Sequence, residues 1–123
     1  MAVKTGLKYT PEHLWIEVSG DNAKIGISEH AAEELGDILF VDLPEEGAAF
    51  AQGEKFSEVE CSKTTSELNL PFAGEVIAVN EELDDSPELI NEGAYDAWIA
   101  EFKITDKAGL DALLTAEAYE ATL

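Results

Sequence analysis

The amino-acid sequence predicts a mainly β protein, built either as a β-sandwich or as a flattened barrel. Short strand-type segments recur at intervals of roughly 8–12 residues, with turn residues between them. Apolar residues make up 46% of the 123-residue chain, which is enough to form a core without disulfides. The length is that of one ordinary domain, so we expect residues 1–123 to form a single one.

The first part of the chain predicts a hairpin, a short helix and a further strand. Residues 14–18 and 23–27 are strand candidates separated by the turn sequence SGDN. Ser28 is a suitable N-cap for a short helix, and Gly36 can end that helix in the left-handed conformation. Residues 38–43 are apolar at both alternating positions, so we expect this strand to be covered on both faces.

Two further strands are predicted in the second half of the chain. They are expected at residues 75–79 and 98–104, and the alternation of the second strand places Trp98 on its apolar face. The segment between them, residues 80–93, is acidic and rich in turn residues. We expect a solvated loop there, in which Pro87 begins a single helical turn.

A helix is predicted at the C-terminal end. Asp106 is expected to cap it, and Gly109 in its first turn is expected to weaken it slightly. The residues expected on its apolar face are Leu110, Leu113, Leu114, Ala118 and Ala121.

The charge of the chain limits its partners. The formal net charge is −20, and all seven basic residues are lysine. Such a surface repels nucleic acid and anionic lipid, and it favours fast, salt-sensitive encounters with basic proteins. No segment has the apolar length of a membrane-spanning helix, and the start of the chain lacks the apolar core of a signal peptide. We expect a monomer in the cytoplasm of a bacterium or archaeon, with a mature mitochondrial protein as the second interpretation.

The most informative segment is residues 57–80, which surrounds a single lysine, Lys63, with two strand-type sequences. The alternating residues on its two sides are Val59, Cys61, Ser66, Leu68 and Leu70. This spacing places Lys63 at or near the tip of a hairpin, where its amine projects into water. That is the presentation needed for a covalently attached, swinging cofactor.

Other chemical centres are not supported by the pattern. Cys61 has the alternation of a small core residue and has no internal disulfide partner, which fits a reducing compartment. His13 and His30 are far apart in the sequence and lack further ligands at metal spacing, so we expect structural or surface roles and no metal site. The acidic segment lacks the alternating oxygen ligands of a calcium loop.

Four blocks of sequence, in order, resemble the H protein family of the glycine cleavage system. The blocks are LKYTPEHLW at 7–15, IGISEHAAEELGDILFVDLPEEG at 25–47, ECSKTTSELNLPFAGEVIAVNEELDDSPELIN at 60–91 and LLTAEAYEATL at 113–123. The resemblance extends from about Leu7 to Tyr119, nearly the whole chain. It implies a barrel-sandwich hybrid, made of two small antiparallel sheets with a short helix in the N-terminal half and a C-terminal helix.

The resemblance further implies a carrier and not an enzyme, with no catalytic residue and with lipoate in amide linkage to Lys63. The implied partners are a pyridoxal-phosphate glycine decarboxylase, a tetrahydrofolate-dependent aminomethyltransferase, a dihydrolipoyl dehydrogenase and a lipoate ligase or lipoyl transferase. The carrier would move the aminomethyl group of glycine from the first enzyme to the second. Glu60, Ser66 and Glu67 are candidates for recognition by the ligase or the partners, and their alternative role is that of a solvated strand face.

Three departures from the family pattern bear on this function. The family usually has Glu-Ser-Val-Lys-Ala at the attachment site, whereas this chain has Glu-Cys-Ser-Lys-Thr at 60–64. Leu14 stands where the family commonly has an acid near the cleft that shelters the loaded arm. The segment 94–98 is altered and shortened. We expect Leu14→Glu to lengthen the lifetime of the loaded arm.

Alternative functions remain open on the sequence alone. The chain is either the aminomethyl carrier, an H-like relay that passes lipoyl groups to other lipoate-dependent enzymes, or an unmodified acidic interaction module. Biotin attachment is disfavoured, because biotin carriers resemble Met-Lys-Met at the lysine and this chain has Ser62 and Thr64 there.

Overall fold

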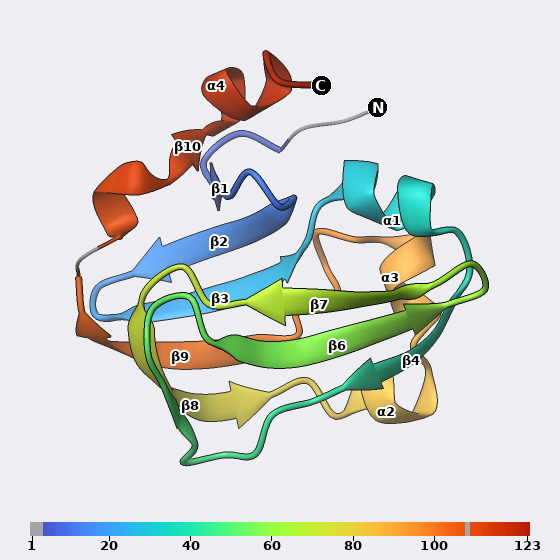
Figure 1. Cartoon of the computed structure of the whole chain (residues 1–123), viewed down its shortest axis with the longest axis horizontal. Coiled ribbons are helices and arrows are strands. Elements are labelled where there is room, and N and C mark those ends of the chain that lie inside the picture. The colour runs from blue at the N-terminus through green and yellow to red at the C-terminus, as the bar shows by residue number, and fades with distance from the viewer. Residues whose placement is uncertain (1–3, 108) are drawn as a thin grey trace.

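The computed structural model describes residues 4–107 and 109–123, which form two antiparallel sheets with short helices at their edges (Figure 1). One sheet has the strand order β10 (Leu114–Thr115), β1 (Lys8–Tyr9), β2 (Leu14–Ser19), β3 (Asn22–Ile27), β9 (Ala100–Asp106), β8 (Ala73–Val79) and β5 (Ala49–Phe50). The other has the order β4 (Ile38–Asp42), β6 (Lys55–Cys61) and β7 (Thr65–Asn69). The predicted fold class is confirmed, and over the described residues the two sheets do not close into a barrel.

The helical segments are short. They are α1 (Glu29–Leu35), α2 (Glu82–Asp85), α3 (Leu89–Glu92), the 3₁₀ turn η1 (Leu110–Ala112) and α4 (Ala116–Glu120). Ser28 caps α1 as predicted, because its Oγ accepts a hydrogen bond from the Ala31 amide at 3.3 Å. Gly36 ends the same helix with a φ of +74°, a conformation that glycine adopts without steric cost. None of the helices in the described ranges is long and apolar enough to cross a bilayer.

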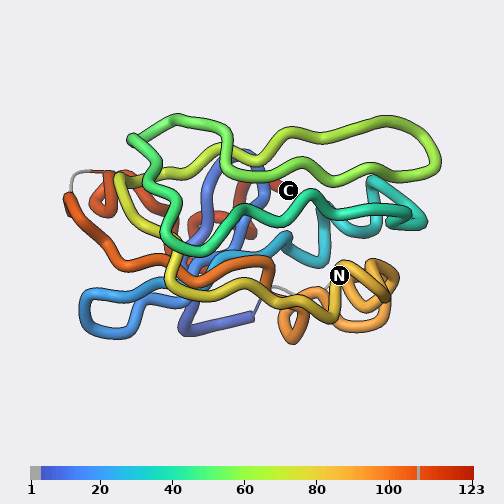
Figure 2. The backbone as a smooth tube through the Cα atoms, turned by 90° about the horizontal axis from the view of Figure 1, so that it is seen from below, coloured from blue at the N-terminus to red at the C-terminus, as the bar shows by residue number. Residues whose placement is uncertain are grey.

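The main hydrophobic core lies between the two sheets. The β6–β7 hairpin forms one layer and β8 with β9 the opposite one (Figure 2). Phe102 of β9 lies at the centre, with its ring edge-to-face against Phe56 of β6 and Phe72 before β8. These aromatic residues are nearly or fully buried, so the hairpin is held on a rigid base.

A second, smaller core joins the two ends of the chain. Tyr9 of β1 stacks on Tyr119 of α4, with ring centroids 4.5 Å apart and the planes within 2° of parallel. Leu7 and Trp15 complete this buried cluster. The packing fastens the C-terminal segment to the edge of the large sheet next to the start of α1.

Two predicted elements were wrong in detail. The strand at 38–43 is not covered on both faces, because Leu39 and Phe40 of β4 are 55% and 45% exposed. The reason is that β4 is an edge strand of the small sheet, and a bulge follows Ile38. The acidic segment 80–93 is also more than a solvated loop, since it forms α2 and α3 and buries Leu83 and Ile90 in the core.

The continuous helix expected after Asp106 is not present. Asp106 is the last residue of β9, and Gly109 has a φ of +95°, which interrupts a right-handed helix. The chain then makes η1 and β10 before α4 begins, with Thr115 as its N-cap. Tyr119 is the buried residue of α4, and the three leucines of the expected apolar face lie on or beside η1 and β10, each half-buried.

Candidate attachment site

Lys63 lies in the turn that connects β6 and β7, and it is exposed. The two strands pair antiparallel up to Glu60 and Thr65, so only residues 61–64 close the turn. The carbonyl of Thr64 accepts hydrogen bonds from both the amide and the thiol of Cys61, at 2.9 and 3.0 Å. The predicted hairpin-tip position of Lys63 is therefore confirmed, whereas its role as an attachment point stays a prediction.

The loop between α1 and β4 supports this turn from one side. The amide of Ser62 donates a hydrogen bond to the carbonyl of Asp37 at 3.1 Å. A Cβ added to Gly36 would lie 3.7 Å from Ser62 Oγ and 3.8 Å from Lys63 Cε, so the lysine stem passes over a bare glycine. Both views place the hairpin tip at the same end of the molecule as α1 (Figures 1 and 2).

Asn91 of α3 fastens the supporting loop in turn. Its side-chain amide donates to the Gly36 carbonyl at 2.7 Å, and its carbonyl oxygen accepts from the Ile38 amide at 2.9 Å. One side chain thus holds both ends of the segment on which the Ser62–Lys63 backbone rests. The turn bearing the lysine is therefore held by the α1–β4 loop, which α3 fastens in turn, and not by its own strands alone.

The three predicted recognition residues do not share one face. Glu60 and Glu67 are exposed on the outer face of the hairpin, where Glu67 lies opposite Glu58. Ser66 is half-buried and pairs with Val59, whose side chain is in the core. The accessible acidic pair near the tip is therefore Glu60 and Glu67.

The lone cysteine is a core residue, as its alternation predicts. Cys61 is a free thiol and is 5% exposed. Leu14, at the position where the resemblance implies an acid, is also buried, with 1% of its surface exposed in β2 opposite Ile27. A carboxylate at position 14 would therefore enter the core of this chain.

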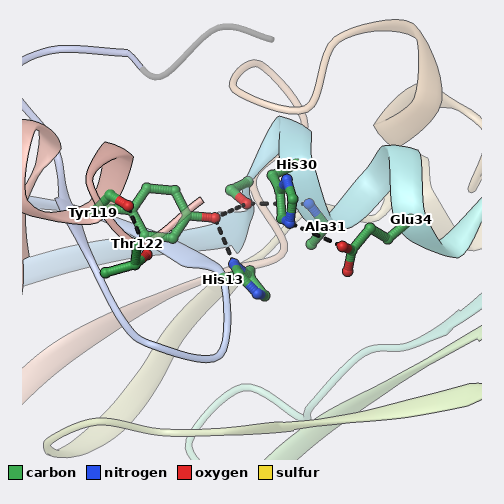
Figure 3. A network of polar contacts seen from close by, with 7 residues as sticks. His13, His30, Ala31, Glu34, Tyr119 and Thr122 are labelled. Atoms are coloured by element: carbon green, nitrogen blue, oxygen red, sulfur yellow. Dashed lines mark hydrogen bonds and ion pairs between the residues drawn. The ribbon is translucent and has the colours of Figure 1, made fainter.

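The structure brings together two histidines that the sequence analysis treated as unrelated. His13, at the turn before β2, and His30 of α1 have ring centroids 4.7 Å apart (Figure 3). His30 Nε2 lies 3.0 Å from an oxygen of Glu34, one helical turn further along α1. The available signal was the i,i+4 spacing of His30 and Glu34, which places both on one helix face. The approach of His13 depends on tertiary packing.

The hydroxyl of Tyr119 joins this cluster through His13. It lies 2.7 Å from His13 Nδ1 and 2.7 Å from Ser28 Oγ. Burial lowers the pKa of His13 and the neighbouring His30 lowers it further, so the neutral imidazole is favoured at physiological pH. The group is a half-buried polar network beside the second core.

Comparison with known proteins gives one consistent result. The family model described as Glycine cleavage H-protein matches residues 7–123. The glycine cleavage system H protein of Staphylococcus carnosus is 50% identical over 121 residues, which cover 98% of this chain and 96% of that protein. The corresponding protein of Geobacillus kaustophilus is 52% identical over 118 residues, covering 95% and 93%. The crystal structure of a glycine cleavage system H protein from Mycobacterium marinum superposes with a TM-score of 0.89 at 35% identity, covering 98% of both chains.

Proposed function

The chain belongs to the glycine cleavage H-protein family, and from that premise we propose that Lys63 carries its lipoyl group in amide linkage. The protein is a lipoyl-bearing carrier of the glycine cleavage system. The observation that supports Lys63 as the attachment residue is its position: an exposed primary amine at the tip of a hairpin that other elements hold in place.

The residues around Lys63 suit this cofactor. Lipoate is joined through an amide, which requires a primary amine that a modifying enzyme can reach, and the turn offers one with exposed neighbours, Ser62 and Thr64. An ammonium group cannot attack an activated acyl group, so the ligase has to take the proton from Lys63 in its own active site. When bound, lipoate supplies a disulfide that accepts the aminomethyl group left after glycine loses carbon dioxide.

The contribution of the chain itself is to hold and present the arm. The hydrogen bond from Ser62 to Asp37 and the clamp by Asn91 support the backbone at the base of the arm, from which the exposed lysine stem extends. A tethered arm reaches a docked active site at a high effective concentration. We assign no catalytic residue to this chain.

We propose that the ligase and the catalytic partners recognise the side chains of Glu60 and Glu67. Both are exposed on the outer face of the hairpin that carries Lys63. The proposed partners are the pyridoxal-phosphate decarboxylase, the tetrahydrofolate-dependent aminomethyltransferase, dihydrolipoyl dehydrogenase and a lipoate ligase or lipoyl transferase.

We further propose that residues 1–123 work as one domain and as a monomer in the bacterial cytoplasm. The similar proteins from Staphylococcus and Geobacillus are bacterial. A buried, free Cys61 fits a reducing compartment.

The intact mass of full-length protein from lipoate-supplied cells tests the attachment. We expect the lipoyl increment in the wild type and in Lys55→Arg, a control in the same hairpin, and its loss in Lys63→Arg. An unmodified wild type would contradict the proposal and favour the interaction module. A lipoylated protein that cannot accept the aminomethyl group from the decarboxylase would point instead to a relay that passes lipoyl groups to other enzymes.

A further inference from the structure

His13, His30 and Glu34 form a compact set of nitrogen and oxygen donors beside the second core. One ligand atom from each side chain lies within 4.8 Å of the other two. Among the described residues this set joins a helix and a turn that are 17 positions apart, counting from His13 to His30. We propose that these three side chains bind a divalent transition-metal ion of the zinc class, independently of the lipoyl function.

The donor chemistry suits that class of ion. Imidazole nitrogen and carboxylate oxygen are ordinary ligands of Zn²⁺, and two histidines with one glutamate are a known three-ligand set that leaves a position for water or another ligand. His30 and Glu34 lie one turn apart on α1, so they face the same side, and His13 approaches from the turn before β2 (Figure 3). Movement of the three side chains toward one another would bring the two nitrogen atoms and the oxygen atom to coordination distance from one ion.

The surroundings orient one ligand in the manner of an established metal site. Metal-binding histidines usually have their second ring nitrogen held by a hydrogen-bond partner, which fixes the ring and its tautomer. Here Tyr119 Oη lies 2.7 Å from His13 Nδ1, and Ser28 Oγ lies 2.7 Å from Tyr119 Oη. Tyr119 and Ser28 are both 0% exposed, so this support is rigid. With Nδ1 held by Tyr119, the other ring nitrogen of His13 is left to bind the ion.

Access and charge also favour a cation at this place. His13 and His30 are half-buried and Glu34 is exposed, so an ion can enter from solvent. The net charge of −20 attracts cations to the surface in general. The chain contains only these two histidines, so an imidazole signal in metal binding can come from no other residue.

The test is a titration of full-length Lys63→Arg protein with Zn²⁺ and with Co²⁺ in excess Mg²⁺. This variant carries no lipoyl thiols that would bind zinc. The excess Mg²⁺ occupies the surface carboxylates, because carboxylate oxygens are the ligands that this hard cation prefers. We expect one ion per chain, a Co²⁺ visible absorption band, and shifts of both histidine ring signals in the NMR spectrum.

Matched variants locate the site. His30→Gln and Glu34→Gln are each expected to weaken Zn²⁺ binding at least roughly tenfold, and Tyr119→Phe by about tenfold through loss of the support to His13. Glu33→Gln, an exposed neighbour on the same helix, is expected to bind as the parent does. Equal Zn²⁺ affinity in His30→Gln and the parent, or loss of all binding when Mg²⁺ is added, would overturn the proposal. Should a His13 variant fail to fold, His30→Gln and Glu34→Gln on α1 still decide the question.

Discussion

Leu14 is a core residue at the start of β2. Its side chain is 1% exposed, and its amide donates to Thr10 Oγ1 at 3.2 Å. Leu14 belongs to the main core, as do Ala31 and Ala32 of α1. The leucine therefore stabilises the main core, and any change at this position has to be judged first by its effect on folding.

We predict that Leu14→Glu lowers the free energy of unfolding by about 3 kcal/mol or more at pH 7, because it places a charge in the core. Burial raises the pKa of such a carboxyl group, so the neutral form is favoured in the folded state. The free energy of unfolding of Leu14→Glu should thus fall further below that of the uncharged control Leu14→Gln as the pH rises from 4 to 7, as measured by urea titration. An equal difference at the two pH values would show that the carboxylate reaches solvent. The lifetime of the loaded arm should be compared only where both proteins are folded.

The hairpin and the helix ends beside it act as one support for Lys63. The β6–β7 turn makes one backbone hydrogen bond to the α1–β4 loop, and α3 contributes Asn91 to the same loop. The lysine turn is therefore only as rigid as these few polar contacts.

We predict that Asn91→Ala lowers stability by about 1–2 kcal/mol, since two hydrogen bonds to backbone groups are lost. The amide protons of Ile38 and Ser62 should exchange faster, and lipoylation of Lys63 should slow because the turn is less ordered. Asn91→Asp keeps the acceptor for Ile38 but cannot donate to Gly36, so it separates the two bonds. Asn69→Ala, at the far end of the hairpin, is the matched control and should leave Ser62 exchange unchanged. Identical exchange in Asn91→Ala would rule out the clamp.

The pairing of β1 with α4 depends on two stacked tyrosines that are held neutral. Burial raises the pKa of Tyr9, and Tyr95 raises it further; burial also raises the pKa of Tyr119. A raised tyrosine pKa means that folding loses stability once the unfolded chain begins to ionise. The contribution is complete below pH 10 and decreases as the pH rises above it.

We predict a steady free energy of unfolding from about pH 8 to 9.5 and a fall above about pH 10, measured by denaturant titration. Tyr9→Phe removes the hydroxyl that donates to the Lys4 carbonyl, so it should cost about 1 kcal/mol at pH 8. Its stability should then fall less steeply above pH 10 than that of the wild type. Parallel curves would mean that Tyr9 does not contribute to the alkaline loss.

Local patterns predicted the elements whose causes are local. The cap by Ser28, the positive φ at Gly36 and the alternation around Lys63 each depend on a few neighbouring residues, and each is present in the structure, although Gly36 has an extended ψ of −145° in place of the predicted left-handed helical conformation. The alternation also places the hairpin that bears Lys63. Its support by Asn91 could not be predicted, because that contact spans 55 positions from Gly36.

Features that depend on long-range packing were missed or misjudged. The exposed face of β4 follows from its place at a sheet edge, which the apolar run at 38–43 does not reveal. The predicted C-terminal helix was too long, because leucines at helical spacing also suit a turn and a short strand. Gly109, with its positive φ, interrupts the helix that the spacing suggested. The histidine pair was missed because only the folded chain brings the turn before β2 onto α1.

Over the described residues, the carrier has two ends, and both expose acidic side chains. The hairpin tip, with Lys63 and the accessible Glu60 and Glu67, lies at the end that also holds α1, α2 and α3. The loop between β4 and β5, which exposes Glu45 and Glu46, lies at the other end (Figures 1 and 2). A partner that reaches Lys63 has to approach the first end, where the acidic pair would meet it.

We predict that association with the decarboxylase is steered by this charge. The Michaelis constant for the carrier should rise at least roughly tenfold between 10 and 200 mM salt, with kcat nearly unchanged, because screening slows the encounter and not the chemistry. The double variant Glu60→Gln, Glu67→Gln should lose more of this salt dependence than Glu45→Gln, Glu46→Gln. Both remove the same charge from a chain of −20, so a difference between them reports position and not net charge. If the Michaelis constants of the two double variants depended equally on salt, Glu60 and Glu67 would serve solubility only. Recognition of the tip would then depend on the shape of the hairpin alone.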